Sequence, residues 1–136
     1  IETVTKGMFE IYEILLGLKF VEVTEQYPDS LYADNIKLFF VYNNDNLEKP
    51  IGCFCLDLFP REGKYSHAAQ FTMVPKSNYN LPICAIVCNF DPKMNIEFNN
   101  VVTFFHEFGH LMHNMSSTNT TFSPDTNFPS INFCVP

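Results

Sequence analysis

The sequence is poor in basic residues, has no tryptophan and holds no long uninterrupted apolar run. Its 8 lysine and arginine residues stand against 15 aspartate and glutamate residues, which gives a formal net charge of −7. Nucleic acids and anionic membranes attract basic proteins, so this balance argues against both as partners. A membrane-spanning helix needs about 20 mostly apolar residues in a row, and a signal peptide needs a basic segment before an apolar one. Neither pattern occurs in the sequence, and we expect no contact with a membrane.

Cysteines are present, but without the Cys-x-x-Cys pairs that are typical of structural zinc sites. They are Cys53, Cys55, Cys84, Cys88 and Cys134. The first four lie in apolar runs, which favours buried, free and reduced thiols and therefore a cytoplasmic location. The 136 residues are 46% hydrophobic, enough for one domain with a buried core. Because the chain starts at Ile1 and ends after a loop-like stretch, we expect a piece cut from a longer protein.

Hydrophobic periodicity predicts an α+β fold. Residues 4–16 repeat apolar side chains with a helical period that ends at Gly17, and residues 101–115 show a second helical period. Residues 20–24 have the composition of a short extended stretch, and strands are expected at 36–42, 51–59, 65–73 and 81–89. Asparagine and aspartate residues between the first two strands predict a β-hairpin. We therefore expect a small, mostly antiparallel sheet of about four strands, packed with the N-terminal helix and the helix at 101–115.

The helix at 101–115 carries the most informative pattern. Residues four apart lie one turn above each other on one face of an α-helix, so the imidazoles of His106 and His110 can reach one metal ion. Glu107 lies beside that ion. Two neutral imidazoles can hold Zn²⁺, a water can occupy an open coordination position, and the Glu107 carboxylate can take a proton from that water. The alternative is a buried helix whose histidines only form hydrogen bonds in the core.

A catalytic zinc site normally has three protein ligands, so a third ligand must come from elsewhere in the chain. His113 returns to nearly the same face, but about 10 Å further along the helix axis, and we expect a supporting or structural role for it. His67 lies on an expected strand, where a single histidine is more often structural than a ligand. Asp125 is the only carboxylate after the helix and Cys134 the only thiol there, and no motif supports either residue as a ligand.

Three segments together resemble one family of proteins. Residues 105–113 read Phe-His-Glu-Phe-Gly-His-Leu-Met-His, which resembles the active-site helix of the thimet oligopeptidase and neurolysin family of zinc peptidases. Residues 54–69, which read Phe-Cys-Leu-Asp-Leu-Phe-Pro-Arg-Glu-Gly-Lys-Tyr-Ser-His-Ala-Ala, are similar to a second signature of that family. Residues 4–20 also resemble the matching family segment. The resemblance therefore runs from residue 4 to about residue 115.

The resemblance implies an endopeptidase of the cytosol or an organelle that cuts short peptides. Its residue roles carry over directly: His106 and His110 would bind Zn²⁺, and Glu107 would be the general base. Members of the family have a large, mostly helical, two-lobed body with a deep channel. Residues 1–136 would then form one partial catalytic domain, a zincin-like core on the channel floor, and we expect a monomer that acts on short peptides in the cytoplasm.

The same resemblance reveals one departure from the family pattern. The family's third ligand is a glutamate well beyond the second histidine, and an alignment on Pro136 places Cys134 at that position. A thiolate can bind zinc, but it donates more strongly and would lower the Lewis acidity of the metal. Two alternatives to an active endopeptidase therefore stay open. One is a truncated or degenerate, catalytically inactive homologue that binds metal or peptide at most weakly, and the other is a structural metal site closed by Cys134 or His67.

Overall fold

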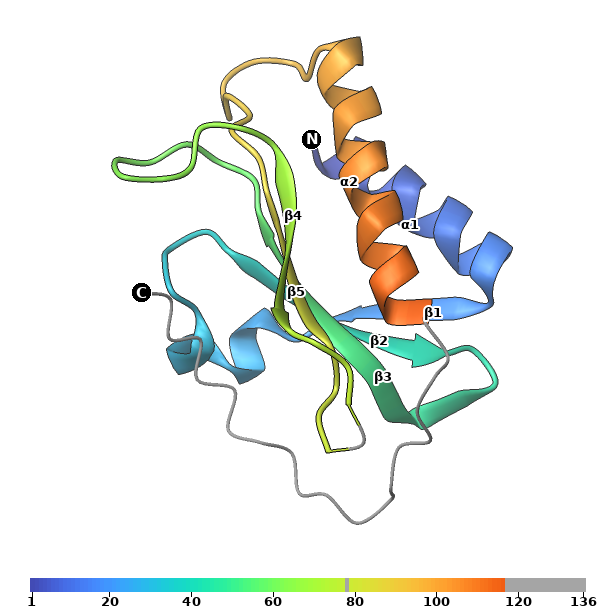
Figure 1. Cartoon of the computed structure of the whole chain (residues 1–136). Helices are drawn as coiled ribbons and strands as arrows, with labels where there is room; N and C mark the ends of the chain where they lie inside the picture. The colour runs from blue at the N-terminus through green and yellow to red at the C-terminus, as the bar shows by residue number, and fades with distance from the viewer. Residues whose placement is uncertain (78, 117–136) are drawn as a thin grey trace.

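The computed structural model describes residues 1–77 and 79–116, which fold into two α-helices and one five-stranded sheet (Figure 1). The elements follow in the order α1 (Glu2–Leu16), β1 (Leu18–Glu22), the 3₁₀ turns η1 (Thr24–Gln26) and η2 (Pro28–Ser30), β2 (Lys37–Asn43), β3 (Asn46–Asp57), β4 (Ala69–Val74), β5 (Ile83–Val87) and α2 (Phe98–Ser116). The strand order is β1-β2-β3-β5-β4, and the pairing is antiparallel except between β3 and β5. The α+β class and the mostly antiparallel sheet are confirmed, but the sheet has five strands and not four.

The additional strand is β1, which the sequence showed only as a short extended stretch. Its residues pair with β2 from Leu18 opposite Asn43 to Glu22 opposite Phe39. Gly17 ends α1 in the left-handed conformation at φ 63°, as its place after the helical period predicted, and the chain turns there directly into β1. A strand of five residues is too short for its alternation of apolar and polar side chains to identify it in the sequence. It forms here because it pairs with β2 of the β2–β3 hairpin.

Two strand starts differ by four residues or more from the prediction. Strand β4 begins at Ala69 and not at 65, because the preceding loop is bound by side chains instead of by a neighbouring strand; Asn89, for example, donates to the carbonyl of Tyr65 at 2.9 Å. Strand β3 begins earlier than expected and runs through Pro50. A register shift in the β2–β3 pairing lies opposite this proline, and a bulge of this kind tolerates the missing N–H.

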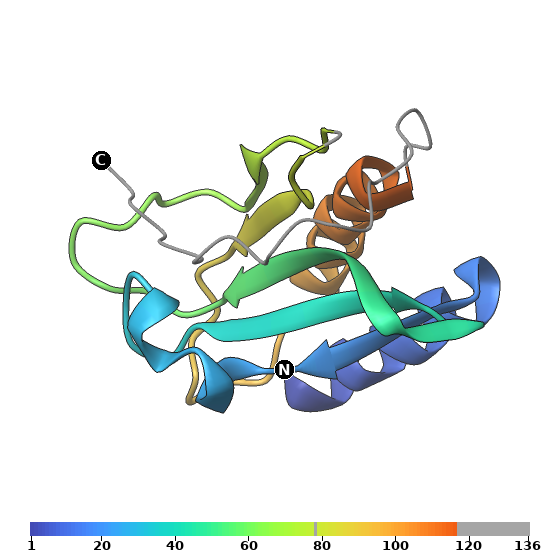
Figure 2. The same ribbon diagram turned by 90° about the horizontal axis from the view of Figure 1, so that it is seen from below.

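The helices and the sheet form two layers. Helices α1 and α2 lie on the same face of the sheet, as Figures 1 and 2 show, and the core between them includes the fully buried Met8, Phe54, Phe104 and Phe108. The opposite face is partly covered by the segment that contains η1 and η2. All five residues of β5 are buried, as the continuous apolar run predicted for a strand covered on both faces. Within the described ranges, neither helix combines the length and apolar character that crossing a membrane requires.

The four cysteines in the described part of the chain are free and buried, as predicted. Cys53 and Cys55 face the η1–η2 side of the sheet, and Cys84 and Cys88 face the helices. Burial raises the pKa of Cys53 and of Cys88 to about 12 and that of Cys84 to about 11. These thiols therefore stay protonated at neutral pH and act as small apolar core residues. Cys134 lies outside the described residues.

Candidate functional site

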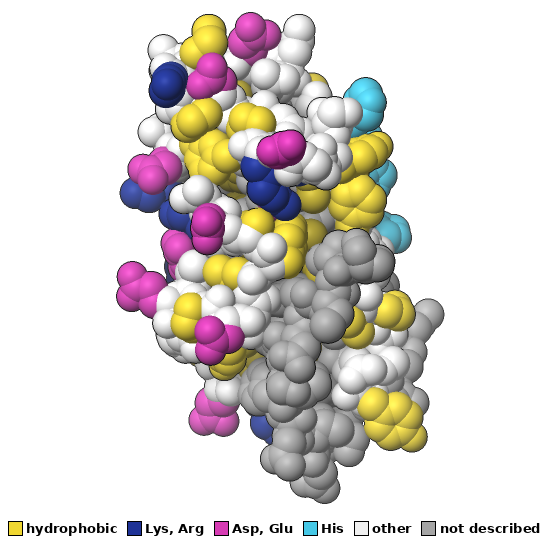
Figure 3. All heavy atoms as spheres, turned by 90° about the vertical axis from the view of Figure 1, so that its left-hand side faces the viewer, with side chains coloured by type: hydrophobic (Ala, Val, Ile, Leu, Met, Phe, Trp, Pro, Cys, Tyr) yellow, Lys and Arg dark blue, Asp and Glu magenta, His cyan; other side chains and the backbone are white. Residues whose placement is uncertain are grey.

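Helix α2 separates its apolar and polar residues as the sequence predicted. Its buried side chains, which hold the helix on the sheet, are Phe104, Phe108, Leu111, Met112 and Met115. His106 and His110 are exposed and Glu107 is half-buried, so the polar triplet lies off the apolar stripe. Figure 3 shows histidine side chains, in cyan, at one edge of the molecular surface. The alternative of a helix whose histidines are buried in the core is therefore wrong for His106 and His110.

The two imidazoles face each other across one helical turn. The Nε2 atoms of His106 and His110 lie 2.9 Å apart, and the ring centroids are 4.6 Å apart with nearly perpendicular planes. Two nitrogen ligands at 2.0–2.1 Å on a tetrahedral zinc ion would be separated by about 3.3 Å, so a small side-chain rotation is enough to hold the metal. The spacing and the exposure of these nitrogens therefore fit Zn²⁺.

Glu107 points from α2 toward the sheet. Its Oε2 accepts a hydrogen bond of 2.8 Å from the backbone N–H of Gln70, which lies near the start of β4. Strand β4 is at the edge of the sheet. The carboxylate is thus held between the histidine-bearing helix and an edge strand, one residue along the chain from His106. The sequence pointed to Glu107 but not to its partner, because every residue except proline has a backbone N–H and the residue type therefore does not identify the donor.

The end of α2 comes close to β3 at Gly52. A Cβ atom built on Gly52 would come within 2.3 Å of the Met115 Sδ and 3.0 Å of the Pro82 Cγ. A larger residue at this point would require the Met115 side chain to move and would press on Pro82. Gly52 was missed in the sequence, although a glycine inside an apolar strand is a recognised signal of close approach.

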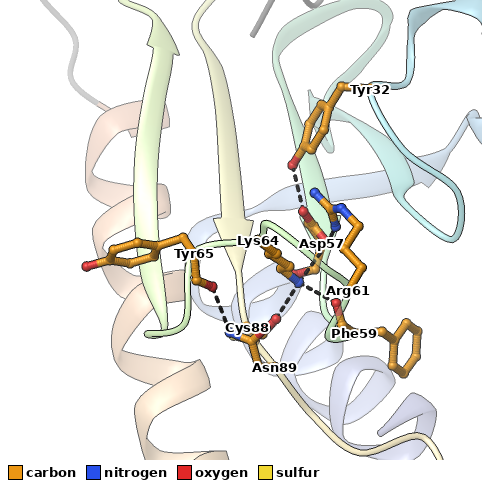
Figure 4. A network of polar contacts seen from close by, with 8 residues as sticks. All are labelled: Tyr32, Asp57, Phe59, Arg61, Lys64, Tyr65, Cys88 and Asn89. Carbon is orange, nitrogen blue, oxygen red and sulfur yellow. Dashed lines mark hydrogen bonds and ion pairs between the residues drawn. The ribbon is translucent and has the colours of Figure 1, made fainter. Parts of the chain in front are cut away.

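A second polar group lies in the loop that follows β3, within the segment Leu-Asp-Leu-Phe-Pro-Arg-Glu-Gly-Lys (Figure 4). The Lys64 Nζ donates to the backbone oxygens of Asp57 at 2.9 Å and Phe59 at 2.6 Å and to the backbone oxygen of Cys88, and it lies 2.8 Å from the Asp57 carboxylate. Arg61 binds the same carboxylate at 2.7 Å, and the Tyr32 hydroxyl donates to it at 3.1 Å. This network ties the loop to the end of β5.

The pKa of Asp57 reflects this environment. Burial by itself would raise the pKa, but hydrogen bonds from Arg61 and Lys64 outweigh burial and hold the pKa below its ordinary value. Burial and the neighbouring Asp57 carboxylate raise the pKa of Tyr32. At neutral pH the group therefore contains one buried carboxylate, two cations and one neutral phenol. Its role is structural, and it gives the long family-like segment a physical reason.

The other candidate ligands are not brought to the histidine pair. His67 lies in the loop before β4, where its ring is 5.6 Å from that of Tyr65, and His113 is exposed on α2. Within residues 1–77 and 79–116, no three His, Cys, Asp or Glu side chains are close enough to hold one metal ion. The two remaining candidates, Asp125 and Cys134, lie outside the described residues. The described part of the site thus offers two ligands and one carboxylate.

Comparison with known proteins gives consistent matches over nearly the whole chain. Residues 1–132 match the profile of Peptidase family M3. The chain is 41% identical over 127 residues to a protein named thimet-like oligopeptidase from Dictyostelium discoideum, and 38% identical over 131 residues to saccharolysin from Saccharomyces cerevisiae. It is 33% identical over 122 residues to a probable thimet oligopeptidase from Arabidopsis thaliana. These alignments cover 85%, 88% and 82% of the chain but only 18%, 18% and 17% of the relatives.

Proposed function

The chain belongs to Peptidase family M3, and on that basis we propose that it forms part of the catalytic region of a zinc-dependent endopeptidase that hydrolyses short peptides. The observation that carries the proposal is the pair of exposed imidazoles 2.9 Å apart on α2. In this proposal His106 and His110 are zinc ligands and Glu107 is the general base. Because the chain spans about a fifth of its curated relatives, the activity belongs to the complete catalytic region.

Each residue has a defined task in the proposed reaction. Bound zinc supplies a Lewis acid that makes water a better nucleophile near neutral pH and polarises the scissile carbonyl. His106 and His110 present their Nε2 lone pairs on the exposed face of α2. Glu107 accepts the proton of the attacking water and later passes it to the leaving amine. The hydrogen bond from Gln70 occupies Oε2, so in this proposal Oε1 accepts the proton.

Replacement of the base tests the assignment. Glu107→Gln keeps the shape of the side chain but cannot accept the proton, so zinc stoichiometry after dialysis should be unchanged and turnover of a quenched short peptide should fall about 10²- to 10⁴-fold. Glu97→Gln, the same substitution at an exposed position just before α2, should leave both unchanged. A Glu107→Gln variant that cleaves at the parent rate would falsify the general-base role.

A second candidate is a catalytically inactive homologue that binds metal or peptide at most weakly. It is favoured by one observation, the absence of a third metal-ligating side chain beside His106 and His110 among the described residues. Two imidazoles alone hold zinc weakly. Stoichiometric zinc after dialysis, together with chelator-sensitive peptide cleavage, would eliminate this candidate. Zinc lost on dialysis and no cleavage would establish it.

The proposal extends to partners and location. The proposed substrates are short peptides, the proposed state is a monomer, and the proposed location is the cytoplasm. The four free thiols in the described part of the chain support a reducing compartment. Sedimentation of the purified chain and fractionation of the source cells test the monomer and the location separately.

A further inference from the structure

Strand β4 contributes to the histidine face through its free edge. It is the last strand of the sheet, with β5 on one side and no other strand of the described chain on the other. Gln70 lies opposite Ile86 in the β4–β5 register, but its backbone N–H is directed to the Glu107 carboxylate. Hydrogen bonds to a charged acceptor are stronger than neutral ones. The edge strand therefore fixes one oxygen of the carboxylate.

The side chain of Gln70 makes a second contact with the same helix. The Asn114 Nδ2 donates to the Gln70 Oε1 at 3.1 Å and to the Thr72 Oγ1 at 3.2 Å. Asn114 is one turn beyond His110 on α2, whereas Glu107 is just under one turn before it. Gln70 and Asn114 are both half-buried. Gln70 thus holds α2 at two points that lie on either side of His110.

We propose that Gln70 is a positioning residue for Glu107. Its N–H fixes the orientation of the carboxylate, and its side chain, through Asn114, fixes the axial position of α2 against β4. A carboxylate on a flexible side chain must otherwise be oriented at each turnover, and misplacement by about 1 Å can lower a rate by as much as about 100-fold. The inference rests on the proposed function, because it assigns Gln70 a task in the reaction for which Glu107 is the base.

Two substitutions at Gln70 separate its backbone from its side chain. Gln70→Ala removes the amide side chain and keeps the N–H, whereas Gln70→Pro removes both. A proline is tolerated here because this N–H does not belong to the β4–β5 ladder. We expect kcat of Gln70→Pro to be about 10- to 100-fold below that of Gln70→Ala, with KM and zinc stoichiometry unchanged. Equal kcat values for the two folded variants would overturn the proposal.

Hydrogen exchange tests the contact without turnover and without a proline. Glu107→Gln keeps a side-chain oxygen that can accept the Gln70 N–H, whereas Glu107→Ala removes the acceptor. The Gln70 amide should exchange about fivefold faster in Glu107→Ala than in Glu107→Gln, since a lost hydrogen bond costs on the order of 1 kcal/mol. Equal exchange rates would overturn the proposal. A parent chain that shows this protection but cleaves no peptide would instead contradict the proposed function and leave the contact established.

Thr72→Val is a matched control for the side-chain contact. It removes the hydroxyl that the side-chain amides of Asn114 and Gln70 both bind, but leaves the Asn114–Gln70 bond and the Gln70 N–H in place. The Gln70 amide should therefore keep its parent exchange rate in Thr72→Val. Faster exchange in this variant than in Glu107→Ala would show that protection comes from general packing at β4, which would also overturn the proposal.

Discussion

Lys64 and His110 both carry nitrogen atoms at the ends of their side chains, but the Lys64 side chain is buried and His110 is exposed. The Lys64 side chain is 2% exposed, and its ammonium has three backbone oxygens and one carboxylate as partners. The His110 imidazole is exposed and contacts the neighbouring imidazole of His106. The ammonium is surrounded by protein partners, whereas the imidazole is exposed and contacts one other imidazole.

The difference follows from what burial does to charge. A charge removed from water costs several kcal/mol unless partners replace the lost solvation, so the Lys64–Asp57 pair is stable only because both ends are fully bonded. A network of this kind holds a loop in place, because Lys64 and Asp57 are bound to each other and to their neighbours. The histidine pair is instead exposed, as the proposed metal site requires. The first group therefore maintains the scaffold, and the second is suited to chemistry.

Removing the ammonium should have the largest effect on stability. Lys64→Met keeps the length of the side chain but leaves the Asp57 carboxylate and the bonded carbonyls without their main partner. The free energy of unfolding should fall by about 3–5 kcal/mol, as is typical when one member of a buried ion pair is removed. Urea denaturation followed by circular dichroism measures the change.

Lys37→Met is the matched control, because Lys37 forms an exposed ion pair with Glu22 at 3.6 Å. Exposed ion pairs contribute about 0–1 kcal/mol, so this variant should be close to the parent in stability. Similar losses in the two lysine variants would contradict the contrast between a saturated network and a solvated surface.

A smaller effect is expected where α2 packs on the sheet. Gly52→Ala introduces a methyl group against the Met115 Sδ and the Pro82 ring, and overpacking in a core costs about 1–3 kcal/mol. Gly7→Ala in α1 is the control: nothing lies within 4 Å of an added Cβ there, so the better helix propensity of alanine should stabilise the chain by about 0.5–1 kcal/mol. If both alanine variants changed stability in the same direction, the close approach at Gly52 would be refuted.

The sequence predicted how the residues of α2 are arranged better than it predicted the sheet. The histidine pair and Glu107 lie within one helical turn or so, and a helix places such residues by a fixed local geometry. Their position off the apolar stripe was therefore predictable. The contact between Glu107 and Gln70 was not, because it joins residues 37 positions apart through a backbone donor.

Long-range pairing explains the remaining differences. Strand β1 and the parallel β3–β5 pair depend on which distant segments pair with each other in the sheet. The hydrophobic periodicity of a single segment does not contain that information. The segment from Asp57 to Lys64 had no evident chemical reason in the sequence. In the structure Lys64 reaches the backbone of Cys88, 24 residues away, and this contact supplies the reason. Next to it, the bond from Asn89 to the Tyr65 carbonyl holds the loop before β4, which starts later than its apolar pattern suggested.

The smallest effect on stability is expected on the histidine face itself. His106→Ala removes an exposed side chain, so without metal the free energy of unfolding should stay within about 0.5 kcal/mol of the parent. Added zinc should distinguish the parent from His106→Ala by the free energy of unfolding. A ligand that binds only the folded state stabilises it by about 2.7 kcal/mol when its concentration is 100 times its dissociation constant. Denaturation with and without zinc should therefore show a metal-dependent gain in the parent and none in His106→Ala. A metal-free loss well above 1 kcal/mol in the variant would mean that His106 supports the fold, and the contrast with Lys64 would then disappear.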